Sequence, residues 1–140
     1  MNAAPCVFCE IVAGRANAYR VYEDEHAVAF LDTRPLFPGH VLVVPREHAE
    51  TLVDLPPGEV APFFARVQRL TGAVQRGMES AGSLVLANNT ISQSVPHLHF
   101  HVIPRNRKDG LRGFLWPRGR YESAERAEEV AGVVRGALGE

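Results

Sequence analysis

The sequence lacks any apolar run approaching the ~20 residues that a membrane-spanning helix needs. It also has few cysteines, and the two present, Cys6 and Cys9, are spaced C-x-x-C. This spacing suits metal or redox chemistry better than a secreted disulfide framework. The N-terminus, MNAAPCVFCEIV, has neither the basic start nor the long apolar core of a secretory signal. These absences predict a cytoplasmic protein that does not bind a membrane.

The chain has no large excess of charge of either sign, with 15 Lys+Arg against 16 Asp+Glu. A net charge of −1 gives no general electrostatic reason to bind a nucleic acid polymer. The 46% hydrophobic content excludes a disordered chain. No repeat or low-complexity linker divides the 140 residues, so we expect a single domain.

Hydrophobic patterning predicts strands, then one long helix, then further strands and a C-terminal helix. The expected strands are 19–22, 26–32, 40–44, 83–87 and 97–103, and the expected helices are about 55–79 and the last twenty residues. The long helix is regular only if Pro62 lies in its first turn. Its apolar face comprises Val60, Phe63, Phe64, Val67, Leu70, Val74 and Met78. Short connections between the early strands favour an α+β fold, an antiparallel sheet with helices on one side.

Three of the six histidines, His97, His99 and His101, lie within five residues. In a strand their imidazoles share one face at intervals of about 7 Å, an arrangement that is improbable without selection because protonated rings would repel one another. Such rings either chelate a metal or orient a central nucleophile. The preceding residues favour the nucleophile, because they are neutral hydrogen-bonding groups suited to a phosphate: Asn88, Asn89, Thr90, Ser92, Gln93 and Ser94.

The segment His97–Ile103 resembles the H-x-H-x-H signature of the histidine triad (HIT) superfamily of nucleotidyl hydrolases and transferases, on its Hint and bacterial HIT side. Four further segments are similar to family blocks in the expected order: CVFCEI, AFLD, PGHVLVVP and QSVP. The resemblance covers about residues 5–105. It implies a single HIT domain over residues 1–140, with a HIT-like α+β fold, a core of about 5–105 and an extension over 106–140.

The resemblance also implies an activity. It is the cleavage of a nucleoside 5′-phosphoryl derivative (a phosphoramidate, a dinucleoside polyphosphate or an adenylated adduct) to a nucleoside monophosphate through a covalent nucleotidyl-histidine. By resemblance His99 is the nucleophile, no catalytic metal is required, and His97, His101 and His40 complete the catalytic set. The implied binding residues for a small purine nucleotide are Phe8, Ile11, Phe30, Leu31, Asp32, Asn88, Gln93, Ser94, His99 and His101. Asp32 would accept hydrogen bonds from the ribose hydroxyls.

In many bacterial relatives the C-x-x-C pair binds a structural zinc. The corresponding ligands here are Cys6, Cys9, His48 and His97, a set that satisfies tetrahedral zinc; the alternative is a pair of free thiols. The family also implies a homodimer formed through the helix at 55–79.

The resemblance is weakest in two places. The loop Asn88–Gln93 lacks the glycine that relatives carry there. The basic stretch 106–121, with Phe114 and Trp116, is expected to be solvated or to face a dimer partner. A non-catalytic nucleotide-binding module and a zinc metallohydrolase remain alternatives. The complete triad argues against the binding module, and loss of activity on chelation would distinguish the metallohydrolase.

Overall fold

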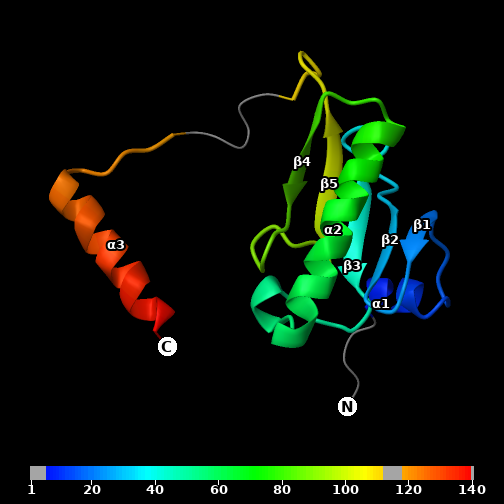
Figure 1. The fold of residues 1–140 in the computed structure, drawn as a ribbon, viewed down its shortest axis with the longest axis horizontal. Helices are drawn as coiled ribbons and strands as arrows, with labels where there is room; N and C mark the ends of the chain where they lie inside the picture. Colours follow the sequence, from blue (N-terminus) through cyan, green and yellow to red (C-terminus); the bar gives the residue numbers. More distant parts are fainter. Residues whose placement is uncertain (1–5, 112–117, 140) are drawn as a thin grey trace. The chain divides into compact units, whose positions relative to one another are not determined.

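A computed structural model describes residues 6–111 and 118–139. The chain divides into two compact units, Met1–Asp109 and Gly110–Glu140 (Figure 1). The single-domain organisation stays a prediction, and Phe114 and Trp116 lie outside the described residues. No helix in the described part of the chain has the length and apolarity that a membrane crossing requires.

The first unit is built on a five-stranded antiparallel sheet, which confirms the predicted α+β class. The strands are β1 (Arg20–Glu23), β2 (Ala27–Leu31), β3 (Val41–Pro45), β4 (Gly82–Leu86) and β5 (Phe100–Arg105). Their order across the sheet is β1-β2-β3-β5-β4, so the late strand β5 lies beside β3. A single 3-10 turn, η1 (Leu52–Asp54), precedes the long helix.

The long helix α2 (Pro57–Gly77) covers one face of this sheet (Figure 1). Its buried residues are Phe63, Val67, Leu70 and Val74, which confirms the centre of the predicted apolar face. Val60 and Met78, at the two ends of that face, are partly exposed. The expectation for Pro62 is wrong: the helix begins at Pro57, whose fixed φ suits the first position, and Pro62 lies in the interior.

A short helix that the sequence analysis did not predict, α1 (Val7–Val12), lies against the opposite face. Its Phe8 and Ile11 pack with Val28, Phe30, Leu42 and Val44. Neighbouring residues of β2 and β3 face α2 instead, which explains why both strands are apolar without alternation. Phe30 pairs with Leu42 and Leu42 with His101. The α1 face therefore carries a row of three side chains, from Phe30 to His101.

The predicted strand 97–103 is wrong at its start, because β5 begins at Phe100. The Leu98 N–H donates to the Ala49 carbonyl at 2.7 Å, outside the strand ladder. Alternation of the side chains persists nevertheless: Leu98, Phe100 and Val102 are all buried in the core beside α2. His99 and His101 therefore remain together on the other side.

In the second unit, the helix α3 (Ala124–Leu138) confirms the predicted C-terminal helix. Ser123 caps it by accepting a hydrogen bond from the Arg126 N–H at 3.0 Å.

Candidate active site

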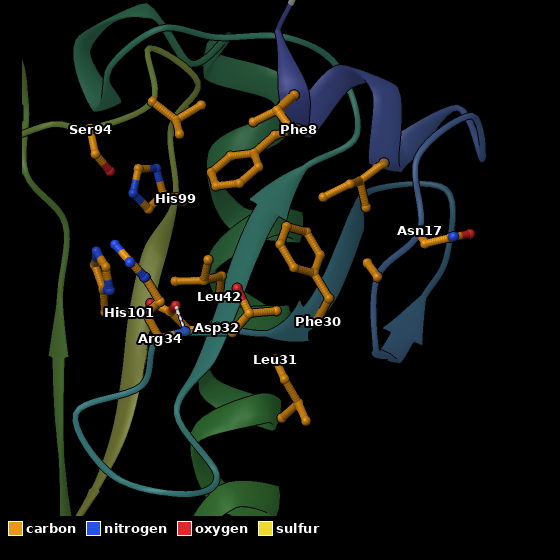
Figure 2. Close-up of a pocket in the computed structure, with 15 residues that line it drawn as sticks. Phe8, Asn17, Phe30, Leu31, Asp32, Arg34, Leu42, Ser94, His99 and His101 are labelled. Atoms are coloured by element: carbon orange, nitrogen blue, oxygen red, sulfur yellow. Dashed lines mark hydrogen bonds between the residues drawn. The ribbon is translucent and has the colours of Figure 1, made fainter.

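A pocket of about 440 Å³ opens on the α1 face of the sheet (Figure 2). One end is apolar and is formed by α1 and the row of side chains on the sheet. The other end is polar, with Asp32, Ser94, His99 and His101 (Figure 2). The pocket therefore suits a ligand that is apolar and flat at one end and carries an anion at the other.

His99 is nearly completely buried, and a single hydrogen bond orients its ring. Its Nδ1 lies 2.7 Å from the His97 carbonyl oxygen. A carbonyl can only accept, so Nδ1 carries the proton and the neutral ring keeps its lone pair on Nε2. The ring of Phe8 packs edge-on against it, with centroids 5.0 Å apart. The main chain thus fixes the tautomer that leaves Nε2 available as a nucleophile.

Two consecutive hydrogen bonds, from Leu36 to His40 and from His40 to His101, orient the His101 ring. The Leu36 N–H donates to His40 Nδ1 at 3.1 Å, so the proton of neutral His40 is on Nε2. That Nε2 lies 2.9 Å from His101 Nδ1, which accepts. The proton of His101 is therefore on its own Nε2. In this form His101 is a hydrogen-bond donor beside the His99 ring, whose centroid is 5.0 Å away.

The imidazole rings of His40 and His101 are both kept neutral by their surroundings. Burial lowers the pKa of His101 to about 4, and repulsion from His99 and His40 adds to the effect. Burial also lowers the pKa of His40, although the Asp32 carboxylate opposes this. Both rings are neutral near pH 7, so the two hydrogen bonds to His40 keep their direction.

Asp32 stands at the carboxyl end of β2, between the apolar end of the pocket and the histidines (Figure 2). Its Oδ1 accepts a hydrogen bond from the Arg34 N–H at 2.9 Å. Its Oδ2 lies 3.6 Å from His40 Nε2, beyond hydrogen-bonding distance. A carboxylate in this position can accept hydrogen bonds from two neighbouring hydroxyls of a ligand.

Most of the predicted nucleotide-binding residues line the pocket. They are Phe8, Ile11, Phe30, Leu31, Asp32, Ser94, His99 and His101. The lining also includes residues that sequence reasoning missed, namely Val7, Asn17, Ala18, Thr33, Arg34, Leu42 and Val95. β3 is apolar on both faces, so no alternation marks Leu42 as a pocket residue, and no local pattern points to the rest.

Asn88 and Gln93 are not among the lining residues, because their amides hold the loop together. Gln93 Nε2 donates to the Glu50 carbonyl at 2.6 Å, and its Oε1 accepts from the Thr90 N–H at 2.8 Å. Asn88 Nδ2 donates to the Ser92 carbonyl at 3.3 Å. Thr90 and Ser92 adopt positive φ values of 69° and 61°. The loop therefore reaches left-handed backbone without the glycine of relatives.

The predicted metal ligands Cys6, Cys9, His48 and His97 come together where α1 begins. Their donor atoms all lie within 4.8 Å of one another. His97 Nδ1 is 3.4 Å from Cys6 Sγ, 3.5 Å from Cys9 Sγ and 3.1 Å from His48 Nδ1. Ligand atoms around tetrahedral zinc are roughly 3.3–3.8 Å apart, given bonds of about 2.0–2.3 Å. The four residues therefore fit a zinc ion.

The tautomer of His97 agrees with this fit. His97 Nε2 donates to the Pro45 carbonyl at 3.0 Å, which directs the Nδ1 lone pair toward the two sulfurs. Burial and the hydrogen bond with Cys6 raise the pKa of the Cys9 thiol to about 11. A bound cation would supply the charge that the thiolate form needs. Because His97 belongs to this cluster, the three triad rings do not converge on one ion.

Known proteins are similar to this chain in both sequence and fold. The HIT domain family model matches residues 13–108. An uncharacterized HIT-like protein of Methanocaldococcus jannaschii is 42% identical over 107 residues, which is 75% of this chain and 82% of that protein. The crystal structure of a HIT family member from Bacillus subtilis has a TM-score of 0.87 and 34% identity, covering 95% of this chain and 96% of that one. The chain belongs to the HIT domain family.

Three further relatives have more informative names. An adenylylsulfatase of Arabidopsis thaliana is 37% identical over 108 residues, 76% of this chain and 55% of that protein. An adenosine 5′-monophosphoramidase of Schizosaccharomyces pombe is 35% identical over 112 residues, 80% of this chain and 83% of that protein. A zinc-bound histidine triad protein from Mycobacterium smegmatis has a TM-score of 0.71 at 38% identity, covering 94% and 96% of the two chains. Among these relatives are two named as hydrolases of adenylyl compounds and one that holds zinc.

Proposed function

We propose that this protein hydrolyses a nucleoside 5′-phosphoryl derivative and releases a nucleoside monophosphate through a covalent intermediate on His99. The observation that carries the proposal is the hydrogen bond from His99 Nδ1–H to the His97 carbonyl, which leaves Nε2 unprotonated in a pocket of nucleotide size. The names of the Arabidopsis and fission-yeast relatives support a hydrolase of adenylyl compounds.

The lining of the pocket suggests how such a substrate binds. The base lies in the apolar end, against Phe8 and Phe30, whose rings pack edge-to-face with centroids 5.4 Å apart. Asp32 accepts hydrogen bonds from the ribose hydroxyls. The α-phosphate then reaches His99, with the Nε2–H of His101 donating to one of its oxygens.

The chemistry has two displacements. In the first, His99 Nε2 forms a bond to the α-phosphorus, and the leaving group departs with the electron pair of its own bond; an amine leaving group also takes up a proton from solvent. The ring becomes positively charged, which strengthens the hydrogen bond from its Nδ1–H to the His97 carbonyl. In the second, water attacks the same phosphorus and loses a proton to solvent, the electron pair of the P–N bond returns to Nε2, and the nucleoside monophosphate leaves.

The Cys6, Cys9, His48 and His97 cluster supports a structural zinc ion. The four protein ligands would occupy all coordination positions of the metal and so leave none for water, as in closed structural sites. It would tie the start of α1 to the segment that leads into β5. The zinc-bound Mycobacterium smegmatis structure supports this assignment. The homodimer, the purine preference and the cytoplasmic location stay predictions.

The test is intact-mass spectrometry after brief mixing with an adenosine 5′-phosphoramidate. We expect a transient adduct of one adenylyl group on the wild type and release of AMP. His99→Ala should give neither, whereas His26→Ala, which alters a histidine outside the pocket, should give both. AMP release that persists in His99→Ala would refute the covalent mechanism.

A further inference from the structure

The proposed mechanism leaves one charged residue of the pocket without a role. Arg34 lines the pocket in the loop after β2, and its side chain is turned toward His101, away from Phe30 (Figure 2). Among the described residues, its guanidinium has no hydrogen-bond or ion-pair partner. It is therefore a cation at the polar end of the pocket that is available to a ligand.

The backbone of Arg34 is fixed even though its side chain is exposed. Its N–H donates to Asp32 Oδ1 at 2.9 Å. Pro35 follows directly and restricts the backbone of the residue before it. The Asp32 carboxylate and the backbone of Arg34 are thus held together. This gives Arg34 a defined position on the pocket wall.

The charge of the pocket favours a role for this cation. Asp32 brings one negative charge, and a nucleotide brings at least one more. His101 and His40 are kept neutral by burial, so they donate hydrogen bonds without offsetting charge. Arg34 is the one lysine or arginine among the lining residues that the structure describes. An anionic ligand therefore depends on it for charge balance.

The order of groups along the pocket indicates which part of the ligand Arg34 meets. Phe30, Asp32 and His101 follow one another from the apolar to the polar end, in the order of base, ribose and α-phosphate (Figure 2). The Arg34 side chain is turned toward the last of these in Figure 2, at the end of the pocket where the group attached to the α-phosphorus would leave. Its planar fork suits the oxygens of a phosphate or a sulfate.

We propose that Arg34 determines the leaving group: it selects substrates in which the α-phosphorus is joined to a phosphate or sulfate over those in which it is joined to a neutral amine. This inference rests on the proposed function. A departing phosphate or sulfate takes the electron pair of the P–O bond onto its bridging oxygen, and the guanidinium stabilises that negative charge. A departing amine needs a proton instead, which an arginine does not supply.

The experiment compares two substrates on three variants. Adenosine 5′-phosphosulfate carries an anionic leaving group, and adenosine 5′-phosphoramidate carries a neutral one. We expect Arg34→Gln to lower kcat/KM for the phosphosulfate about 10- to 100-fold more than for the phosphoramidate, the usual effect of losing one charge-assisted contact. Arg34→Lys should restore part of the difference. Arg76→Gln, an exposed arginine on α2, across the sheet from the pocket, should match the wild type.

A binding measurement separates this inference from the proposed function. Calorimetry with ADP and AMP should show that Arg34→Gln weakens ADP binding more than AMP binding, whether or not the enzyme turns over. If the wild type binds nucleotides but cleaves neither substrate, the proposed function fails and the ADP-to-AMP ratio alone decides the role of Arg34. An equal loss for both ligands, or no loss, overturns the role of Arg34 in selection. Wild-type protein that binds neither nucleotide overturns both proposals.

Discussion

Replacing His101 with asparagine should make the metal-free protein less sensitive to acid. His101 is neutral in the folded protein down to about pH 4, whereas in the unfolded chain it takes up a proton near its ordinary value of 6.5. Between these values the unfolded state binds more protons. The stability that the neutral ring contributes is therefore complete above pH 6.5 and is lost as the pH falls toward 4.

The size of the effect follows from the same numbers. Each pKa unit corresponds to about 1.4 kcal/mol, so lowering the pKa of His101 from 6.5 to about 4 makes the free energy of unfolding fall by about 3 kcal/mol across this range. His101→Asn removes the titrating group, yet its side-chain oxygen can still accept from His40 Nε2–H. Burial also lowers the pKa of His97 to about 4. Because His97 is present in both proteins, its contribution to the pH dependence cancels in the comparison.

Urea unfolding followed by circular dichroism measures this difference. The protein is held in chelator, so that no metal binds the cysteine cluster, and is unfolded at about pH 7 and about pH 4. The loss of stability between the two conditions should be about 3 kcal/mol smaller in His101→Asn than in the wild type. Equal losses in the two proteins would show that His101 is not held neutral by its surroundings, and the proton positions assigned to the histidine chain would then be wrong.

Three further predictions concern the pocket wall, the metal cluster and one turn. Phe8→Ala removes an aromatic wall of the pocket; it should lower the free energy of unfolding by about 3 kcal/mol and weaken AMP binding, and unchanged affinity in calorimetry would contradict the assigned base site. Cys9→Ser should reduce bound zinc from one ion per chain to almost none by elemental analysis, with a lower Tm; full zinc retention would count against the cluster. Gly39→Ala should destabilise the protein by about 1–3 kcal/mol in urea unfolding, because Gly39 has a φ of +95° and a Cβ there would lie 2.5 Å from Met78 Cγ. Gly14→Ala, with a φ of +81° and open space around it, should cost less; an equal cost would show that the contact with Met78 contributes nothing.

The parts of the fold that the sequence predicts well are those with long regular patterns. The period of α2 extends over five turns, so its buried face is clear from the sequence. The helix α1 has only six residues, too few for a period. It is held instead by Phe8 and Ile11 packing on the sheet, and by Cys6 Sγ accepting from the Cys9 N–H at 3.3 Å. Contacts with distant strands decide such an element, and a local pattern does not contain them.

The residues of the site also divide into those that the sequence predicts and those that depend on contacts distant in the sequence. The triad stands out because its residue types are unusual at that spacing, and Asp32 is expected from the resemblance to the family. Leu42 enters the pocket because the register pairs it with both Phe30 and His101, which depends on strands far apart in the sequence. Gln93 is a suitable residue to meet a phosphate, yet its amide bonds to Glu50 and Thr90. Residue type alone does not reveal that the Gln93 side chain forms hydrogen bonds within the protein instead.

The hydrogen bond that orients His99 has an evolutionary consequence, because its acceptor is a main-chain oxygen. Every amino acid at position 97 supplies the same carbonyl, so no single substitution there deletes the acceptor. Natural variation can therefore exchange the His97 side chain, and with it the metal cluster, while descendants inherit the geometry of the nucleophile. Lineages that gain or lose the metal can in this way keep one reaction.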